Sequence, residues 1–138
     1  MIDNFRGKYF FLSNFYNSPV TYGGITYQNS EAAFQAQKTL DIEKRKEFSK
    51  IEPALAKRKG MQVKLRSDWE DVKLGTMLEV CRAKFTQNPQ LAKRLLATGD
   101  EELVEGNNWG DTFWGKVDGK GQNHLGRILM QIRDALKE

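Results

Sequence analysis

The sequence predicts a compact, mainly helical fold made of a single domain, residues 1–138, with a small β-hairpin near the N-terminus. A chain of 138 residues is the right size for one hydrophobic core. Apolar residues recur at helical spacing in the longest uninterrupted segments. A Gly-Gly pair between β-forming residues supplies one clear hairpin signal.

The N-terminal part of the chain contains the hairpin and the first helix. Residues 5–16 mix aromatic and polar side chains and are expected to form an extended or irregular entry. Residues 21–27 are expected to form the hairpin, with its two glycines at the turn. Either Asn29 or Ser30 can cap a helix that is expected to run to about Leu40.

Caps and helix breakers mark the remaining elements. The sequence predicts helices from Asp41 to about Lys50, Pro53 to Gly60, Ser67 or Asp68 to about Thr86, and Pro89 to about Thr98, then a short strand over 101–105 and a last helix capped by Asn123. The apolar stripe expected on the longest helix consists of Leu74, Leu78, Cys81 and Phe85. The core face expected on the last helix consists of Leu125, Ile128, Leu129, Ile132 and Leu136.

Composition narrows the classes of function. The net charge is +4 and the isoelectric point about 9.2, which favours phosphorylated ligands or nucleic acid. The basic stretches 44–50 and 57–66 are read either as solvated helix faces or as a nucleic-acid stripe. One cysteine excludes an intrachain disulfide and favours a reducing compartment, so a cytoplasmic protein is expected. One histidine and one cysteine argue against zinc, and no apolar run is long enough for a membrane helix.

The helix with the sequence SEAAFQAQKTL is the first candidate for chemistry. At 100° per residue, one helix face carries Glu31, Phe34, Gln35 and Lys38. This face is either a solvated one with a Glu–Lys pair or a partly buried functional one. The large ring of Phe34 favours burial, because such a ring is rarely left in water.

A second cluster surrounds the start of the longest helix. Arg66 stands beside Asp68 and Trp69, and a helix N-terminus with an adjacent arginine can bind phosphate. The alternative is an ordinary cap with surface charges. Aromatic rings of the opening segment can stack on a base or simply close the core.

The segment 103–130 combines carboxylates, asparagines, two tryptophans and six glycines instead of a hydrophobic period. This mixture suits a polar, aromatic ligand such as a nucleotide or an N-glycoside. The alternative is a tight loop region in which the polar groups satisfy one another.

Five short motifs in a fixed order resemble the NADAR superfamily, and in particular its YbiA-like branch. They are FLSNFY, SEAAFQAQK, LRSDWEDVK, LLATGDEELVEGNNWGDTFWG and GQNHLGRILMQIR, and they extend from about Phe11 to Arg133. The resemblance implies a YbiA-like helical fold and hydrolysis of N-glycosidic bonds. Two substrate classes are associated with the family: ADP-ribose attached to guanine in nucleic acid, and the ribosylaminopyrimidine phosphate intermediates of riboflavin biosynthesis.

In both classes ribose C1 is bonded to an exocyclic amino nitrogen, and such a glycoside can open to an imine. One hypothesis is therefore that Lys38 attacks C1 and forms a Schiff base while Glu31 moves the protons. The other is that Glu31 or Asp111 activates water directly. Lys38, Glu31 and Asp111 are the predicted catalytic residues.

The predicted substrate-binding residues are Arg6, Ser13, Asn14, Phe15, Gln35, Arg66, Trp69, Glu105, Asn107, Trp114, Gly115 and Asn123. The arginines are candidates for phosphate contacts, the aromatic residues for stacking, and the polar residues for ribose hydroxyls or heterocycle edges. The expected partner is an ADP-ribosylated nucleic acid or a phosphorylated N-riboside, with no cofactor, no metal, no membrane and no stable protein partner. Two other classes stay open: a module that binds NAD or ADP-ribose without turnover, and a basic protein that binds unmodified nucleic acid.

Overall fold

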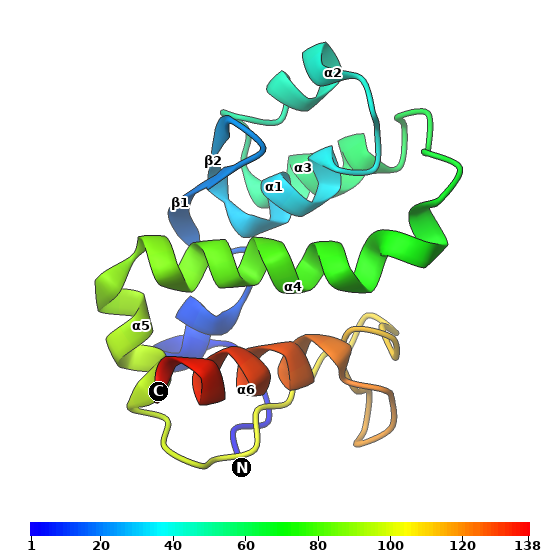
Figure 1. The fold of residues 1–138 in the computed structure, drawn as a ribbon. Helices are drawn as coiled ribbons and strands as arrows, with labels where there is room; N and C mark the ends of the chain where they lie inside the picture. Colours follow the sequence, from blue (N-terminus) through cyan, green and yellow to red (C-terminus); the bar gives the residue numbers. More distant parts are fainter. The chain divides into compact units, whose positions relative to one another are not determined.

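The computed structural model describes residues 1–138 and is mainly helical, with one antiparallel hairpin near the N-terminus (Figure 1). The elements are η1 (Gly7–Leu12, a 3-10 helix), β1 (Asn17–Tyr22), β2 (Ile25–Asn29), α1 (Ser30–Ala36), α2 (Ile42–Lys46), α3 (Pro53–Gly60), α4 (Trp69–Gln87), α5 (Pro89–Leu96) and α6 (His124–Leu136). The predicted fold class is thus confirmed. None of the helices combines the length and the apolar character needed to cross a membrane.

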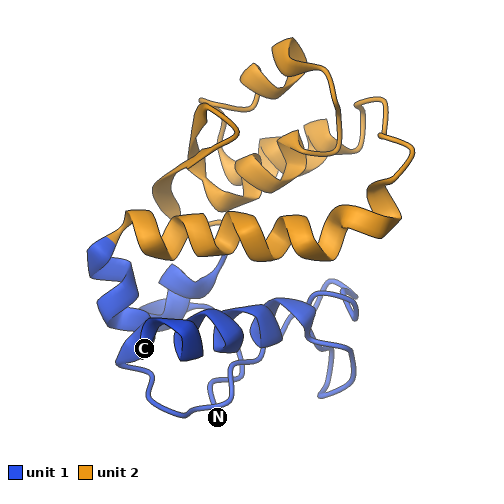
Figure 2. Cartoon of the chain, viewed as in Figure 1, with its two compact units in different colours: residues 1–13, 89–138 blue, residues 14–88 orange.

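Two compact units divide the chain (Figure 2). One consists of residues 14–88 and contains the hairpin with α1 to α4. The other consists of residues 1–13 and 89–138 and contains η1, α5, α6 and the loop between α5 and α6.

In unit 14–88 the hairpin is longer than predicted but turns at the predicted place. Gly23 and Gly24 have φ angles of 58° and 82°, which glycine adopts without a steric penalty. The Tyr22 hydroxyl donates to Glu79 Oε1 of α4 at 2.6 Å and fastens the hairpin to that helix. Val20 and Tyr27 face each other across the two strands and are buried.

Helix α1 is buried along its whole length, from Ser30 to Ala36. Asn29 caps it, because its side chain accepts from the backbone N–H of Ala32 at 2.7 Å. The helix ends earlier than predicted, since Gln37 turns back and donates through its side chain to the carbonyl of Ala33 at 3.0 Å. Leu40, the predicted end of this helix, lies beyond it and is 64% exposed. Because every residue of α1 is buried, the interpretation of its polar face as a solvated one is wrong.

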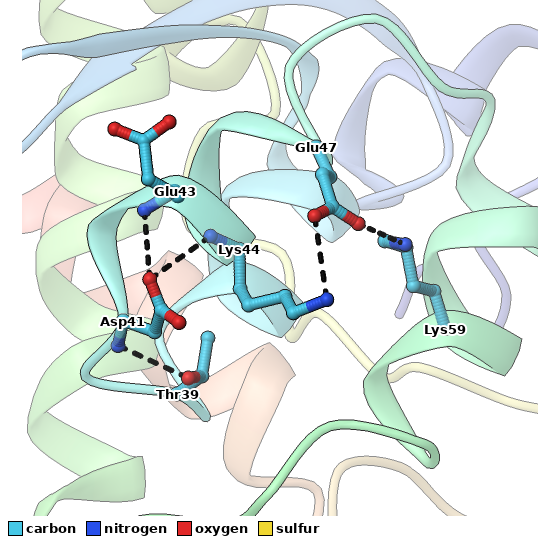
Figure 3. A network of polar contacts seen from close by, with 6 residues as sticks. All are labelled: Thr39, Asp41, Glu43, Lys44, Glu47 and Lys59. Carbon is cyan, nitrogen blue, oxygen red and sulfur yellow. Dashed lines mark hydrogen bonds and ion pairs between the residues drawn. The ribbon is translucent and has the colours of Figure 1, made fainter.

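Helix α2 also ends earlier than predicted, at Lys46 instead of Lys50. Asp41 caps it as expected and accepts from the backbone N–H groups of Glu43 and Lys44 (Figure 3). Glu47, just after the helix, pairs with Lys59 of α3 at 2.7 Å. This ion pair connects α2 to the last turn of α3.

The apolar stripe predicted on α4 is partly wrong. Leu74 is 41% exposed, whereas Met77, Val80 and Lys84 are buried together with the expected Cys81 and Phe85. The buried face of α4 is therefore rotated away from Leu74, and it includes a lysine that hydrophobic spacing could not select.

In unit 1–13 and 89–138, α6 buries Leu125, Ile128, Leu129 and Ile132, four of the five predicted core positions. The strand predicted over 101–105 is reduced to a single parallel bridge between Ile2 and Leu103. Residues 5–16, expected to be extended or irregular, contain the 3-10 helix η1.

Asn123 stands at the start of α6 but makes no side-chain cap there, which corrects the predicted N-cap. Its backbone adopts a left-handed conformation with φ 53°. Its side chain instead bonds backbone groups of residues 103 and 105, so that it fastens the preceding loop to the helix.

Candidate functional site

The acid of the predicted catalytic pair lies in the first turn of α1. Glu31 is 8% exposed, and its Oε2 accepts from Gln35 Nε2 at 2.7 Å. The i, i+4 spacing of these two residues places them one above the other on the helix. Gln35 is 6% exposed, and its Oε1 is buried without a hydrogen-bond partner. Of the four residues predicted to share this face, Glu31, Phe34 and Gln35 lie on α1 and are buried.

Lys38 was predicted to lie on the same helix, but α1 ends at Ala36, and Lys38 lies two residues beyond it and is half-buried. Loss of solvent on burial lowers the pKa of Lys38 below 10.5, and the charges of Lys57 and Lys73 lower it further. The Glu31 carboxylate acts in the opposite direction, so its charge reaches the amine. A larger fraction of Lys38 is therefore the uncharged, nucleophilic amine than for a solvated lysine.

Asn14 fastens the start of α1 to α4. Its carbonyl accepts from the Glu31 backbone N–H at 3.0 Å, and its Oδ1 accepts from Ser30 Oγ at 2.9 Å. Its Nδ2 donates to Met77 Sδ at 3.3 Å. Asn14 is only 6% exposed, so these internal bonds engage the polar atoms that were predicted to contact substrate.

The aromatic and basic residues near α1 also have internal partners. The Trp69 ring is 6% exposed and lies 5.2 Å from the Phe34 ring, at an angle of 54°. The Arg66 guanidinium binds both carboxylate oxygens of Asp68, at 2.6 and 3.0 Å. Arg66 thus meets a carboxylate of its own chain at the position where a phosphate was predicted.

A second buried amine, Lys84 of α4, was missed by the sequence analysis. Its side chain is 1% exposed, and its Nζ lies 5.7 Å from the centroid of the Tyr16 ring and 5.1 Å from that of Phe85. Burial lowers the pKa of Lys84 to about 8. The residue before an aromatic one in a helix carries no sequence signal of burial, so only the packing reveals it.

In the other unit, Asn107 organises the loop that was predicted to contact the ligand. Its Nδ2 donates to Glu105 Oε2 at 3.0 Å and to the carbonyl of Asp111 at 2.9 Å. Its Oδ1 accepts from the backbone N–H groups of Trp109 and Asp111 at 3.3 and 3.1 Å. One buried amide therefore closes the whole turn from 105 to 111.

The two carboxylates of this loop are held differently. The Glu105 backbone N–H donates to Asn123 Oδ1 at 2.9 Å, while its side chain meets Asn107. Asp111 Oδ1 accepts from the backbone N–H groups of Phe113 and Trp114 at 3.1 and 2.9 Å. Its second oxygen, Oδ2, makes no hydrogen bond within the chain, and the residue is half-buried.

Gly115 comes close to protein groups of the same loop. A Cβ at this position would overlap the side chain and the carbonyl of Glu105 and would lie 2.9 Å from Asn107 Nδ2. The absence of a side chain at Gly115 thus makes room for the polar pair itself.

The aromatic residues of this unit form a cluster at the start of α6. The Trp114 ring lies 4.8 Å from the Phe113 ring, edge to face, and 6.4 Å from the His124 ring. His124 Nε2 in turn shares a hydrogen bond with Gln122 Oε1 at 2.7 Å. Trp114 is half-buried, which leaves part of its ring accessible.

Arg6 lines a cavity of about 470 Å³ within the same unit. The walls come from the N-terminal segment and from the loop, and they include Asn4, Asn107, Asn108, Lys116 and Asp118. The side chains of Arg6 and Lys116 make no ion pair within the chain. Lys116 and Asn108 were not selected from the sequence, because loop positions have no period that predicts a shared wall.

The predicted residues thus gather into two groups, one in each unit. In unit 14–88, Asn14, Glu31 and Gln35 lie together at α1, Trp69 packs on Phe34 of the same helix, and the Arg66 backbone N–H donates to the Lys38 carbonyl at 2.8 Å. In unit 1–13 and 89–138, the predicted residues Glu105, Asn107, Asp111, Trp114, Gly115 and Asn123 lie together in one loop, and Arg6 shares a cavity with Asn107. Phe15 belongs to the first of these units and Ser13 to the second. Nowhere do three His, Cys, Asp or Glu side chains meet as a metal ion would require.

Comparison with known proteins identifies the family. The NADAR domain matches residues 3–137. The chain belongs to the NADAR family. It is 42% identical to the N-glycosidase YbiA of Escherichia coli K12 over 129 residues, which are 91% of this chain and 80% of that protein. The NMR structure of E. coli YbiA matches with a TM-score of 0.84 and 39% identity, covering 99% of this chain and 87% of that one.

A riboflavin biosynthesis protein of Vibrio vulnificus is also 42% identical, over 93% of this chain. The chain spans only 36% of that longer protein. These findings confirm the predicted family and the YbiA-like fold. The chain carries the enzyme class of its N-glycosidase relatives, a hydrolase that acts on N-glycosyl bonds.

Proposed function

We propose that this NADAR enzyme hydrolyses the bond between ribose C1 and an exocyclic amino nitrogen, and that it removes ADP-ribose from guanine in nucleic acid. Lys38 is the nucleophile and Glu31 the proton donor and acceptor. Asp111 is the alternative base, for a route in which water attacks C1 directly.

The observation that carries the proposal is that Lys38 is half-buried and within electrostatic reach of Glu31. Burial favours the uncharged amine of Lys38, and the carboxylate is close enough to influence its pKa. Schiff-base chemistry requires an uncharged amine and a group that carries protons, and the lowered pKa of Lys38 favours the first. A module that only binds ADP-ribose would need neither group.

The proposed reaction consists of ring opening, exchange of the amine at C1 and hydrolysis. Protonation of the ribose ring oxygen opens the sugar and leaves an imine between C1 and the exocyclic nitrogen. The Lys38 amine adds to C1, and the exocyclic nitrogen takes a proton and leaves as the free amino group of the base. Water then adds to C1 of the Lys38 Schiff base, which restores the lysine amine and releases the sugar as its aldehyde. Glu31 carries the proton between ring oxygen, leaving nitrogen and water.

Nucleic acid as the carrier of the ADP-ribose is supported by the net charge of +4. The cavity that Arg6 and Lys116 line offers two cationic side chains that form no ion pair, although Asp3 and Asp118 also line it. Both are available for phosphate groups, whereas Arg66 already binds Asp68. Trp114 supplies a half-buried ring for stacking on a base.

The second candidate function is hydrolysis of ribosylaminopyrimidine phosphates from riboflavin biosynthesis. The relative in V. vulnificus is named as a riboflavin biosynthesis protein. Ribosylaminopyrimidine phosphates also have a bond from ribose C1 to an exocyclic amine, so Lys38 and Glu31 can act on them in the same way. A single phosphate would need fewer cationic contacts than an ADP-ribosylated strand.

The test is a product assay by mass spectrometry on purified protein. One reaction contains guanine-ADP-ribosylated DNA and the other the ribosylaminopyrimidine phosphate. Free ADP-ribose from the DNA, lost in Lys38→Ala and Glu31→Gln, supports the proposal. Ribose phosphate from the pyrimidine alone supports the second candidate.

Two binding measurements separate the classes that do not turn over a substrate. Retained ADP-ribose affinity with no cleavage of either substrate would point to a binding module. Affinity for unmodified DNA that falls steeply with salt, and that gains nothing from the ADP-ribosyl group, would point to a nucleic-acid-binding protein.

A further inference from the structure

The orientation of the Gln35 side chain follows from its two neighbours. Its Nε2 donates to Glu31 Oε2 at 2.7 Å, which a carboxylate acceptor requires of the amino end of the amide. Its Oε1 therefore points the other way, into the protein, where it is buried and has no hydrogen-bond partner. A buried amide oxygen without a hydrogen-bond partner is uncommon in proteins and needs a structural explanation.

The unpartnered Oε1 of Gln35 faces Gly60, the last residue of α3. A Cβ at position 60 would overlap Gln35 Oε1 and would lie 2.8 Å from its Cδ and 3.2 Å from its Cβ. Gly60 has an ordinary negative φ, so its backbone does not demand a glycine. The requirement for glycine comes from the space that the amide occupies.

Helix α3 has two further contacts next to Gly60. Lys59, the residue before Gly60, pairs with Glu47 at 2.7 Å (Figure 3). The Nζ of Lys59 also lies 5.7 Å from the centroid of the Phe48 ring. Phe48 is fully buried. A side chain at position 60 would therefore displace the amide of Gln35 before it displaced the helix.

We propose that Gly60 is a positioning residue for Glu31: by lacking a side chain, it lets the Gln35 amide reach the carboxylate and hold it in one orientation. The inference rests on the proposed role of Glu31 in catalysis. Gly60 touches no substrate in this account, and it acts through Gln35.

The decisive comparison is between Gly60→Ala and Gly75→Ala. Gly75 is also a helical glycine, but it is exposed on α4 and a Cβ there would meet nothing within 4 Å. Gly60→Ala is expected to lower kcat by about a hundredfold, the scale for a displaced catalytic group, with little change in KM. Gly75→Ala is expected to leave both constants unchanged.

A readout that does not depend on activity separates this inference from the proposed function. In the labelled full chain, the side-chain NH₂ signals of Gln35 report its bond to Glu31 by NMR. They are expected to move toward the positions of a solvated amide in Gly60→Ala and in Glu31→Gln, but not in Gly75→Ala. If the wild type cleaves neither substrate, the proposed function fails, and the amide signals still test the contact.

Two further variants keep the test decisive if Gly60→Ala folds poorly. Gln35→Met removes the amide but keeps the length of the side chain, and it is expected to lower kcat as Gly60→Ala does. In the double variant Gly60→Ala with Gln35→Ala, the loss should equal that of Gln35→Ala alone, because the clash no longer exists. A folded Gly60→Ala or Gln35→Met with the kcat of the wild type would overturn the inference.

Discussion

The two candidate clusters are built by different means. On α1, helical spacing and burial hold Glu31 against Gln35. In the loop of the other unit, the side chains of Asn107 and Asn123 hold Glu105, which itself belongs to no helix or strand. A buried helix resists local change because many packed neighbours fix it, whereas the loop depends on a few hydrogen bonds. A substitution in the first cluster should therefore remove a reacting group without moving its neighbours. A substitution in the second should displace the groups that the loop positions.

The largest effect should come from removing Lys38, the proposed nucleophile. Lys38→Ala is expected to lower kcat by a factor on the order of a thousand or more, because the step it performs has no substitute. The matched control is Lys46→Ala, which removes an exposed lysine on α2. The measurement is single-turnover product formation. An active Lys38→Ala would mean that water attacks directly.

The second largest effect should come from the loop. Asn107→Ala removes both ends of the amide that closes the turn from 105 to 111, so Glu105 and Asp111 lose their placement. We expect a fall in kcat/KM of about a hundredfold, as for misplaced catalytic groups. Faster amide hydrogen exchange should be confined to the loop. Thr112→Ala, at an exposed position of the same loop, is the control.

If Asn107→Ala instead lowered the melting temperature of the whole protein without local exchange, the distinction between the two clusters would be lost. The loop would then be part of the cooperative core.

A third effect concerns the free energy of unfolding, and it comes from a buried residue of unit 14–88. The pKa of Lys84 is about 8 in the folded chain, against an ordinary value of 10.5. Between these values the unfolded chain binds the extra proton, so the free energy of unfolding should rise with pH. The expected rise is about 3 kcal/mol, from roughly 1.4 kcal/mol for each pH unit. Lys84→Met should lack it in denaturant titrations.

Tyr22 has the opposite sign, since burial and its bond to Glu79 raise its pKa to about 12. Between pH 10 and 12 this residue should reduce stability as pH rises. The wild type and Lys84→Met both contain Tyr22. Subtracting the stability–pH curve of Lys84→Met from that of the wild type therefore isolates the contribution of Lys84. A difference that stays flat from pH 8 to 10.5 would refute the assignment.

The smallest expected effect is a shift of the pH–rate curve. Because burial lowers the pKa of Lys38, the rate should rise with pH and level off below pH 10.5. The charge of Lys57 contributes to this lowering. Lys57→Gln should therefore move the curve to higher pH, whereas Lys46→Gln should leave it in place. A shift to lower pH would show that another group limits the rate.

The helical half of the candidate site was accessible from the sequence because helical spacing is regular. Counting residues places Glu31, Gln35 and Lys38 on one face; the buried contact between Glu31 and Gln35 agrees with this, but α1 ends before Lys38. Burial itself was less predictable. Leu74 looked like part of a core stripe and is exposed, while Lys84 is buried, because neighbouring elements decide which face of a helix is covered.

The loop shows where sequence reasoning ends. Its asparagines were recognised as important, but their partners were not, since Asn123 bonds a backbone group eighteen positions away. The contact between Gly60 and Gln35 is of the same kind. A glycine at a helix end has an obvious explanation as a terminator, so nothing in the sequence reveals the amide packed against it.

The central claim, nucleophilic attack by Lys38, is tested most directly by trapping. The wild type is incubated with guanine-ADP-ribosylated DNA and borohydride, and its peptides are then mapped by mass spectrometry. We predict a stable adduct of the reduced ADP-ribosyl group on the peptide that contains Lys38, absent from Lys38→Ala. Full turnover by the wild type with no adduct on any lysine would contradict it.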